Sequence, residues 1–192
     1  ESSKANADTN PFEDHYGYGH QVAMSGDGRR IAISFAGKDG SDRTFGYHID
    51  ILSFDGSNWS KERTITDVRR DHGHDYVVRF QSLVMSSDGK RVAFSDGHGI
   101  AIFEFNDVSW VGITGIPDPY VTSNDASPRR DVAREFGTAL AMNCDGTIIA
   151  VAGRAPGMTF TKMYRMLERQ ENFAKGIQWV LFGEIHDKPW GG

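Results

Sequence analysis

The stretch Ala-Met-Ser-Gly-Asp-Gly at residues 23–28 recurs as Val-Met-Ser-Ser-Asp-Gly at 84–89 and as Ala-Met-Asn-Cys-Asp-Gly at 141–146. Each copy is followed, two residues later, by a short apolar run, which reads Ile-Ala-Ile, Val-Ala-Phe and Ile-Ala-Val in turn. The three aspartates are separated by 61 and 57 residues. A period of this length is typical of repeat architectures, in which one small unit stacks on copies of itself.

Each repeat predicts four antiparallel strands, because short alternating apolar runs are bounded by turn residues. The Asp-Gly pairs suit the positive φ values of a tight hairpin between the first two strands. The fourth strand opens on a tryptophan in every copy: Trp59, Trp110 and Trp179. Between residues 164 and 176 the pattern is irregular, and the spacing of Met163 and Met166 predicts a lengthened loop with local helix.

A four-stranded sheet of this size cannot bury both faces alone, so we expect the units to pack radially as blades. The alanine between two bulky residues in each apolar run fits such a taper: Ala32, Ala93 and Ala150. The predicted fold is all-β, with three four-stranded antiparallel β-propeller blades. Because propellers have about four to eight blades, we expect a larger or partner-completed propeller. A β-sandwich is the alternative, but it gives no reason for three in-phase copies.

The predicted organisation is an N-terminal arm at residues 1–17, blades at 18–66, 79–117 and 135–186, and a C-terminal connector at 187–192. The chain begins at Glu1 without Met, from which we expect a removed targeting segment or a piece of a longer chain. The compartment stays open, with an extracellular or lumenal location favoured. The single cysteine, Cys144, lies in a turn, so we expect an exposed thiol and no internal disulfide.

The composition argues against two classes of partner. The net charge is −5, with 26 acidic and 21 basic residues interspersed and no basic face, so we do not expect nucleic-acid binding. No apolar run approaches the roughly 20 residues of a membrane span.

The units resemble FG-GAP-type β-propeller repeats, the family that includes the integrin α-chain head. The resemblance is carried by Tyr18-Gly19 and Phe136-Gly137 before the turn, the Asp-Gly turn, the apolar-Ala-apolar strand and the later tryptophan. The second repeat departs from this pattern, with Arg79-Phe80 in the Phe-Gly place. The run at residues 87–94 also resembles the PD40-type blades of TolB-like propellers.

The FG-GAP resemblance implies a calcium loop of the form Asp-x-Asp-x-Asp-Gly-x-x-Asp in the first hairpin of metal-binding blades. Here each turn keeps one aspartate only, since the other ligand places hold residues such as Ala23, Ser25 and Ile31. Ca²⁺ requires six to eight oxygen ligands. We therefore predict no calcium in these hairpins and no cofactor.

One cluster has the residue types of a metal site: Asp71, His72, His74 and Asp75. Zn²⁺ usually needs three or four convergent ligands, and a polar connector between blades explains the same residues. No catalytic set is predicted, because the chain has no Gly-x-Ser-x-Gly elbow and no phosphate-binding glycine loop. The Ser-x-Asp-Gly turn resembles a sialidase Asp-box, but the aromatic residue expected after its glycine is missing. Asn58-Trp59-Ser60 is a formal N-glycosylation sequon.

The connectors between blades share a rim with the loops between the second and third strands. These segments differ most among the copies, and functional variation on a repeat scaffold concentrates there. The predicted partner-binding residues are Arg69, Arg70, Asp118, Tyr120, Asn124, Asp125, Arg129 and Arg130. The expected function is a non-enzymatic module that binds or scaffolds other protein chains. The alternatives are a carbohydrate-binding propeller, or part of a propeller-type hydrolase or lyase whose active site lies outside this chain.

Overall fold

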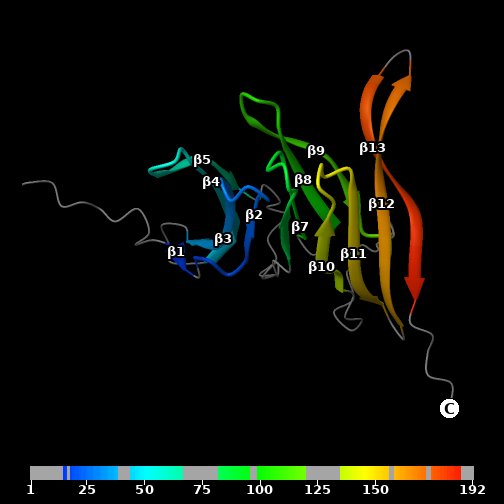
Figure 1. Ribbon diagram of the computed structural model, residues 1–192. Helices are drawn as coiled ribbons and strands as arrows, with labels where there is room; N and C mark the ends of the chain where they lie inside the picture. Colours follow the sequence, from blue (N-terminus) through cyan, green and yellow to red (C-terminus); the bar gives the residue numbers. More distant parts are fainter. Residues whose placement is uncertain are drawn as a thin grey trace, which may run out of the picture.

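Three antiparallel sheets, of five, four and four strands, stand side by side in the computed structural model, which describes residues 15–16, 18–38, 44–66, 82–95, 99–119, 135–155, 158–171 and 174–186 (Figure 1). Within these ranges every regular element is a strand and none is a helix. The predicted all-β architecture of stacked propeller blades is confirmed.

Each sheet follows the chain from one edge to the other, and we call the sheets blades 1 to 3. Blade 1 consists of β1 (His15–Tyr16), β2 (Val22–Met24), β3 (Arg30–Lys38), β4 (Thr44–Phe54) and β5 (Trp59–Thr66). Blade 2 consists of β6 (Leu83–Met85), β7 (Arg91–Ser95), β8 (Gly99–Phe105) and β9 (Trp110–Pro117). Blade 3 consists of β10 (Glu135–Met142), β11 (Ile148–Ala155), β12 (Met158–Glu171) and β13 (Ala174–His186).

The inner strand of blade 1 is made of two pieces, since β1 and β2 both pair with the same edge of β3. The break lies at Gly19, which has φ +87° and donates its N–H to the carbonyl of Ser34 at 3.0 Å. Gly137 has the same φ in blade 3, where the register of β10 shifts between Phe136 and Ala139. The repeated aromatic-Gly pair therefore marks a bend of the inner strand. β1 lies within the stretch predicted as an N-terminal arm.

The cores lie between the blades, at two contacts that we call the first seam (blades 1 and 2) and the second seam (blades 2 and 3). At the first seam Ala32, Ile49 and Ile51 pack against Val92 and Phe94. The second seam joins blade 2 residues, including Ala93 and Ile102, to blade 3 residues, including Ile149 and Val151. Because side chains alternate along a strand, Val92 and Phe94 face blade 1 while the alanine between them faces blade 3. The predicted role of the alanines as small residues between flat sheets is confirmed at both seams.

The prediction of a loop with local helix in blade 3 is wrong. β12 and β13 form one long hairpin, paired from Phe160–His186 to Glu171–Ala174 with a register shift between Met163 and Tyr164. Trp179 consequently lies within β13 and pairs with Met166, whereas Trp59 and Trp110 open their strands as predicted. The spacing of the methionines fits a helical turn, but the cross-strand partners available in β13 decide the structure. Figure 1 shows this hairpin rising beyond the other strands.

Candidate functional site

The Asp-Gly turn of blade 1 is closed by side chains as well as backbone. The Ser25 hydroxyl donates to Oδ1 of Asp27 at 2.7 Å and accepts the Arg30 N–H at 2.9 Å. Within this turn only Gly28 takes a positive φ, +69°, so the loop is a type I turn followed by a left-handed glycine, and Asp27 does not adopt the positive φ that was predicted for the Asp-Gly pair. The hydrogen bonds from Ser25 and the Arg29 amide hold the pKa of Asp27 below its usual value.

The same closure recurs in the other blades, with Asn143 replacing serine in blade 3. Its amide N–H₂ donates to Asp145 at 2.8 Å and its amide oxygen accepts the Ile148 N–H at 2.8 Å. Each aspartate is thus engaged within its own turn. This supports a structural role for the motif, and the prediction of calcium-free hairpins stays a prediction. Among the described residues, no three His, Cys, Asp or Glu side chains gather as metal ligands would.

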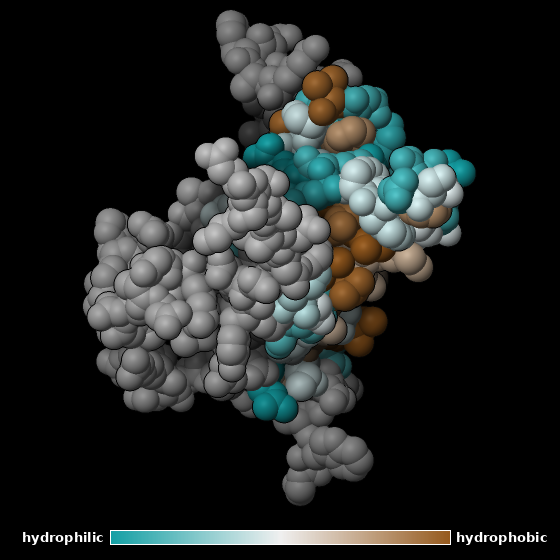
Figure 2. All heavy atoms as spheres, turned by 90° about the vertical axis from the view of Figure 1, so that its left-hand side faces the viewer, coloured by the Kyte–Doolittle hydropathy of each residue, from teal (hydrophilic) through white to brown (hydrophobic). Residues whose placement is uncertain are grey.

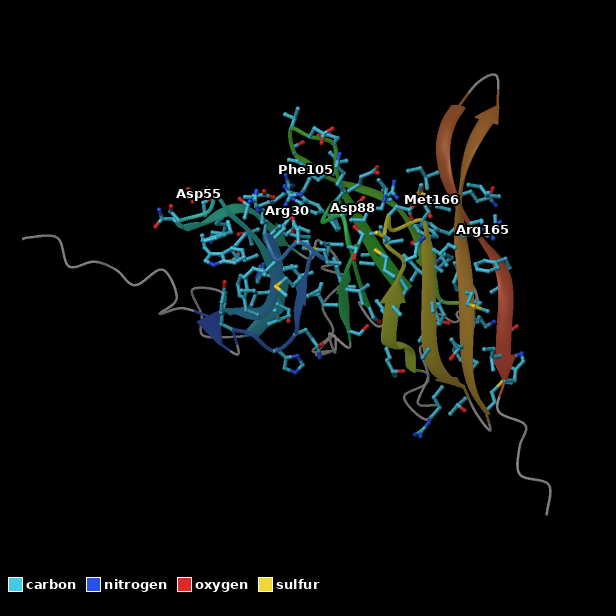
Figure 3. The ribbon with its side chains drawn as sticks, in the orientation of Figure 1. Arg30, Asp55, Asp88, Phe105, Arg165 and Met166 are labelled. Carbon is cyan, nitrogen blue, oxygen red and sulfur yellow. The ribbon has the colours of Figure 1, made fainter. Side chains whose placement is uncertain are left out.

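A charged network crosses the first seam near its outer end. Arg30 pairs with Glu62 of its own blade at 2.8 Å, and it donates to the Gly89 carbonyl of blade 2 at 2.8 Å. Its guanidinium carbon lies 4.4 Å from the ring centre of Phe105 (Figure 3). Trp110 completes the network from blade 2 by donating its indole N–H to Glu62 at 2.9 Å.

Corresponding contacts cross the second seam. Arg91 pairs with Glu104 of its own blade and donates to the Asp145 carbonyl of blade 3 at 2.6 Å. Trp179 of blade 3 donates its indole N–H to the Thr114 carbonyl at 2.8 Å. At each seam, therefore, an arginine reaches forward to the next turn and a tryptophan reaches back to the preceding outer strand. Trp110 and Trp179 thus contribute to the packing between blades at the two seams.

The outward side of blade 1, which we call the front face, has no described blade against it. Val22 and Met24 are 58% and 60% exposed there, whereas their counterparts Leu83 and Met85 are 6% and 8% exposed at the first seam. Figure 2 views the molecule from this end and shows hydrophobic atoms flanked by hydrophilic ones. The front face therefore presents to solvent the side chains that blade 2 buries.

Two further positions show the same difference. Trp59 is 44% exposed, whereas Trp110, at the same place in blade 2, is 2% exposed. A Cβ built at Gly28 would meet nothing within 4 Å, but one built at Gly89 would meet Ser25 of blade 1 at 3.1 Å. Among the residues that the structure describes, the front face thus has no neighbour at its inner turn or at its outer strand.

The outward side of blade 3, which we call the back face, is also apolar. Ala150 is only half-buried, whereas Ala32 and Ala93, its counterparts at the seams, are completely buried. Toward the outer strand the back face exposes Phe182 and Ile185. Both ends of the arc therefore carry seam-type surfaces without a described partner.

A carboxylate on the outward side of blade 1 is buried, so the front face is open at Val22, Met24 and Trp59 but covered at Asp50. Asp50 alternates with Ile49 and Ile51, which face blade 2, and it accepts hydrogen bonds from Thr64 and, at 3.3 Å, from Lys61. Burial raises the pKa of the Tyr18 phenol, and the charge of Asp50 and its hydrogen bond with Tyr18 raise it further. This cluster was not predicted, because nothing in the repeat distinguishes an aspartate inside a strand.

The structure tests few of the predicted site residues. The candidate metal ligands Asp71, His72, His74 and Asp75 lie outside the described residues, as do seven of the predicted partner-binding residues: Arg69, Arg70, Tyr120, Asn124, Asp125, Arg129 and Arg130. Asp118 is described and is buried, which favours a structural role for its carboxylate. Cys144 is exposed, as predicted.

Arg30 and Glu62, which lie at the first seam, were also not predicted. A signal existed for the arginine, because Arg30 and Arg91 both stand three residues after the turn aspartate. Among the described residues, no helix is long and apolar enough to cross a membrane.

Comparison with known proteins adds two distant structural likenesses. No protein-family model and no curated protein matches the chain. One similar structure is that of a Lactobacillus plantarum protein, with 13% identity and a TM-score of 0.49, over 89% of this chain and 41% of that one. Another is the β-propeller domain of the trilobed protease from Pyrococcus furiosus, described as having an open velcro topology, with 12% identity and a TM-score of 0.46, over 92% of this chain and 57% of that one. The chain spans less than two thirds of either solved chain, and its FG-GAP type stays a prediction.

Proposed function

We propose that this chain is a non-enzymatic β-propeller module that binds another protein through the open faces of its end blades. The observation that carries the proposal is the contrast at equivalent positions, where Val22 and Met24 are exposed while Leu83 and Met85 are buried. Exposed apolar surface of this kind costs free energy in water, and burying it would stabilise a complex by about 25 cal/mol for each Å². The connector residues predicted as partner contacts remain a proposed second contact area.

The test is a paired capture experiment with the source organism's native extract. Immobilised wild type is compared with Met24→Asp, which places a charge on the inner strand of the front face. The matched control is Val108→Asp, because Val108 is 88% exposed in the turn between β8 and β9, away from that face. We expect a protein that wild type and Val108→Asp retain and that Met24→Asp loses.

Other outcomes decide against the proposal. A partner retained equally by all three proteins would mean that the front face is not the binding surface. Binding of glycans to the immobilised chain, with no protein retained, would favour the carbohydrate-binding alternative. Turnover of a substrate by the purified chain would favour the hydrolase or lyase alternative.

A further inference from the structure

Resting on this proposed function, we propose that the partner on the front face is the back face of a second copy of this chain. Two copies would then join head to tail, with blade 3 of each packed against blade 1 of the other. These two open faces resemble the faces that meet at the internal seams.

The apolar parts of the two open faces are complementary in the way that the seams are. At each seam, the preceding blade supplies an alanine-bearing flat surface and the following blade supplies bulky side chains. On the back face Ala150 pairs in register with Ala141, so two small residues lie side by side. On the front face Val22 and Met24 are the exposed bulky residues. The chain therefore carries both halves of one more seam.

The front face also carries the counterpart of the aromatic pair that receives an arginine at the first seam. Arg30 lies over Phe105 and Trp110, whose ring centres are 5.6 Å apart. The counterpart in blade 1 is Phe54 and Trp59, with ring centres 5.2 Å apart. This pair has no described arginine above it, and a cation over aromatic rings is a stabilising arrangement.

The back face supplies such a cation from a neighbouring strand. Ile148 stands where blades 1 and 2 have Arg30 and Arg91, so the forward-reaching arginine is missing from its usual place. Arg165 pairs directly opposite Ile148 in the sheet and is exposed. It lies on the back face because Tyr164, the preceding residue, packs toward blade 2. Its guanidinium already stacks on Phe182, with 4.9 Å between the guanidinium carbon and the ring centre, and Figure 3 labels it on β12.

Head-to-tail contacts form a ring when the rotation closes and a filament when it does not. Two copies of the three described blades give six, which lies within the range of about four to eight found in closed propellers. Both contacts of such a ring are identical, each joining a front face to a back face. A closed dimer would leave no seam-type surface of the described blades open.

The experiment is sedimentation equilibrium of the chain at concentrations from about 1 to 200 μM, a range that covers micromolar association. We expect a dimer for wild type. Met24→Asp on the front face and Arg165→Glu on the back face should each raise the dimer dissociation constant at least about 100-fold, because each buries an unpaired charge at both contacts. Ile185→Asp repeats the test of the back face at an exposed site. Val108→Asp is the matched control and should leave the dimer unchanged.

Mixing two variants tests the head-to-tail arrangement directly. An equimolar mixture of Met24→Asp and Arg165→Glu contains one undamaged contact, between the wild-type front face of one variant and the wild-type back face of the other. We expect the mixture to associate more strongly than either variant alone. Near-ultraviolet circular dichroism of each variant shows whether it is folded.

Three results would overturn the inference. A wild-type monomer at every concentration excludes the second copy as partner, and a dimer sensitive to Met24→Asp alone means that two front faces pair with each other. Insensitivity to both face variants places the contact elsewhere. The proposed function is tested separately. If the chain is monomeric but still captures a protein that Met24→Asp loses, the proposed function stands with a different partner. If the chain is monomeric and captures no protein, both proposals fail.

Discussion

Trp110 of blade 2 donates its indole N–H to Glu62 of blade 1 at 2.9 Å, and Arg30 holds the other oxygen of the same carboxylate at 2.8 Å. Burial alone would raise the pKa of Glu62, but the hydrogen bonds from Trp110 and Arg30, with the positive charge of Arg30, hold it below its usual value. The carboxylate thus ties the outer strand of one blade to the first residue of the outer strand of the next.

The first prediction concerns Glu62→Gln. A glutamine can accept the tryptophan hydrogen bond but loses the ion pair, so we expect the free energy of unfolding at pH 7 to fall by about 1–3 kcal/mol. Because the folded-state pKa lies below the unfolded one, the contribution of Glu62 is complete above the unfolded value, near 4.5, and is lost as pH falls through the folded value. Urea unfolding between pH 3 and 7 should show the wild-type and variant curves converging in acid.

The control for this prediction is Asp107→Asn, which removes the partner of Lys90 in an exposed ion pair. Exposed pairs contribute roughly 0–1 kcal/mol, so this variant should unfold nearly as wild type does at pH 7. Equal losses for the two variants would contradict the special role of the seam carboxylate.

The second prediction concerns Arg30→Lys. A lysine keeps the charge and can reach Glu62, but it lacks the planar fork that donates to Glu62 and Gly89 while stacking on Phe105. We expect a loss of about 1–2 kcal/mol in the free energy of unfolding, compared with less than about 0.5 kcal/mol for the exposed Arg29→Lys. Thermal or urea unfolding of both variants at one protein concentration checks this, and full retention of stability by Arg30→Lys would contradict it.

Most of the fold could be predicted from the repeat, because each of the three copies independently indicates the same order of strands. Periodicity alone failed where one copy departs from the others, as it did in the β12–β13 hairpin. Met163 and Met166 lie three residues apart, a spacing that a helix and a bulged strand both allow. Only the pairing of Met166 with Trp179, thirteen residues further along, selects the strand.

The open faces could be predicted only in part. That three blades leave two ends follows from the repeat count, but which side chains lie on those ends depends on strand register. The role of Glu62 was not predictable, because its partners Arg30 and Trp110 lie 32 and 48 residues away along the chain. The predicted sites in the connectors were chosen for their variability, and the structure describes only Asp118 among them.

The third prediction concerns the serine of the turn motif. Ser86 is completely buried, accepts the Arg91 N–H at 2.8 Å and donates to Asp88 at 2.6 Å. Ser86→Ala leaves that N–H without its acceptor, so we expect a loss of about 1–3 kcal/mol in the free energy of unfolding. Ser87→Ala, at the exposed neighbouring position, is the control and should change it by less than about 0.5 kcal/mol.

A rescue variant sharpens this prediction. Asn143 makes both contacts of the motif in blade 3, so Ser86→Asn should retain more stability than Ser86→Ala if its extra atoms fit. Amide hydrogen exchange at Arg91 gives a local measure, and it should be faster in Ser86→Ala than in wild type. Unchanged exchange there would mean that the hydroxyl is not the acceptor that protects this amide.

The last prediction compares two glycines with the same backbone and different neighbours. Gly137 and Gly19 both have φ +87°, a conformation that costs an L-residue about 1–2 kcal/mol. A Cβ at Gly137 would lie 2.5 Å from the Ser95 hydroxyl and 2.8 Å from Ile100, whereas one at Gly19 would meet nothing within 4 Å. Urea unfolding should therefore give a loss of about 1–2 kcal/mol for Gly19→Ala and at least about 1–3 kcal/mol more for Gly137→Ala. Equal losses would mean that the backbone conformation alone requires glycine, and that the close approach of blade 3 to blade 2 at this point imposes no further constraint.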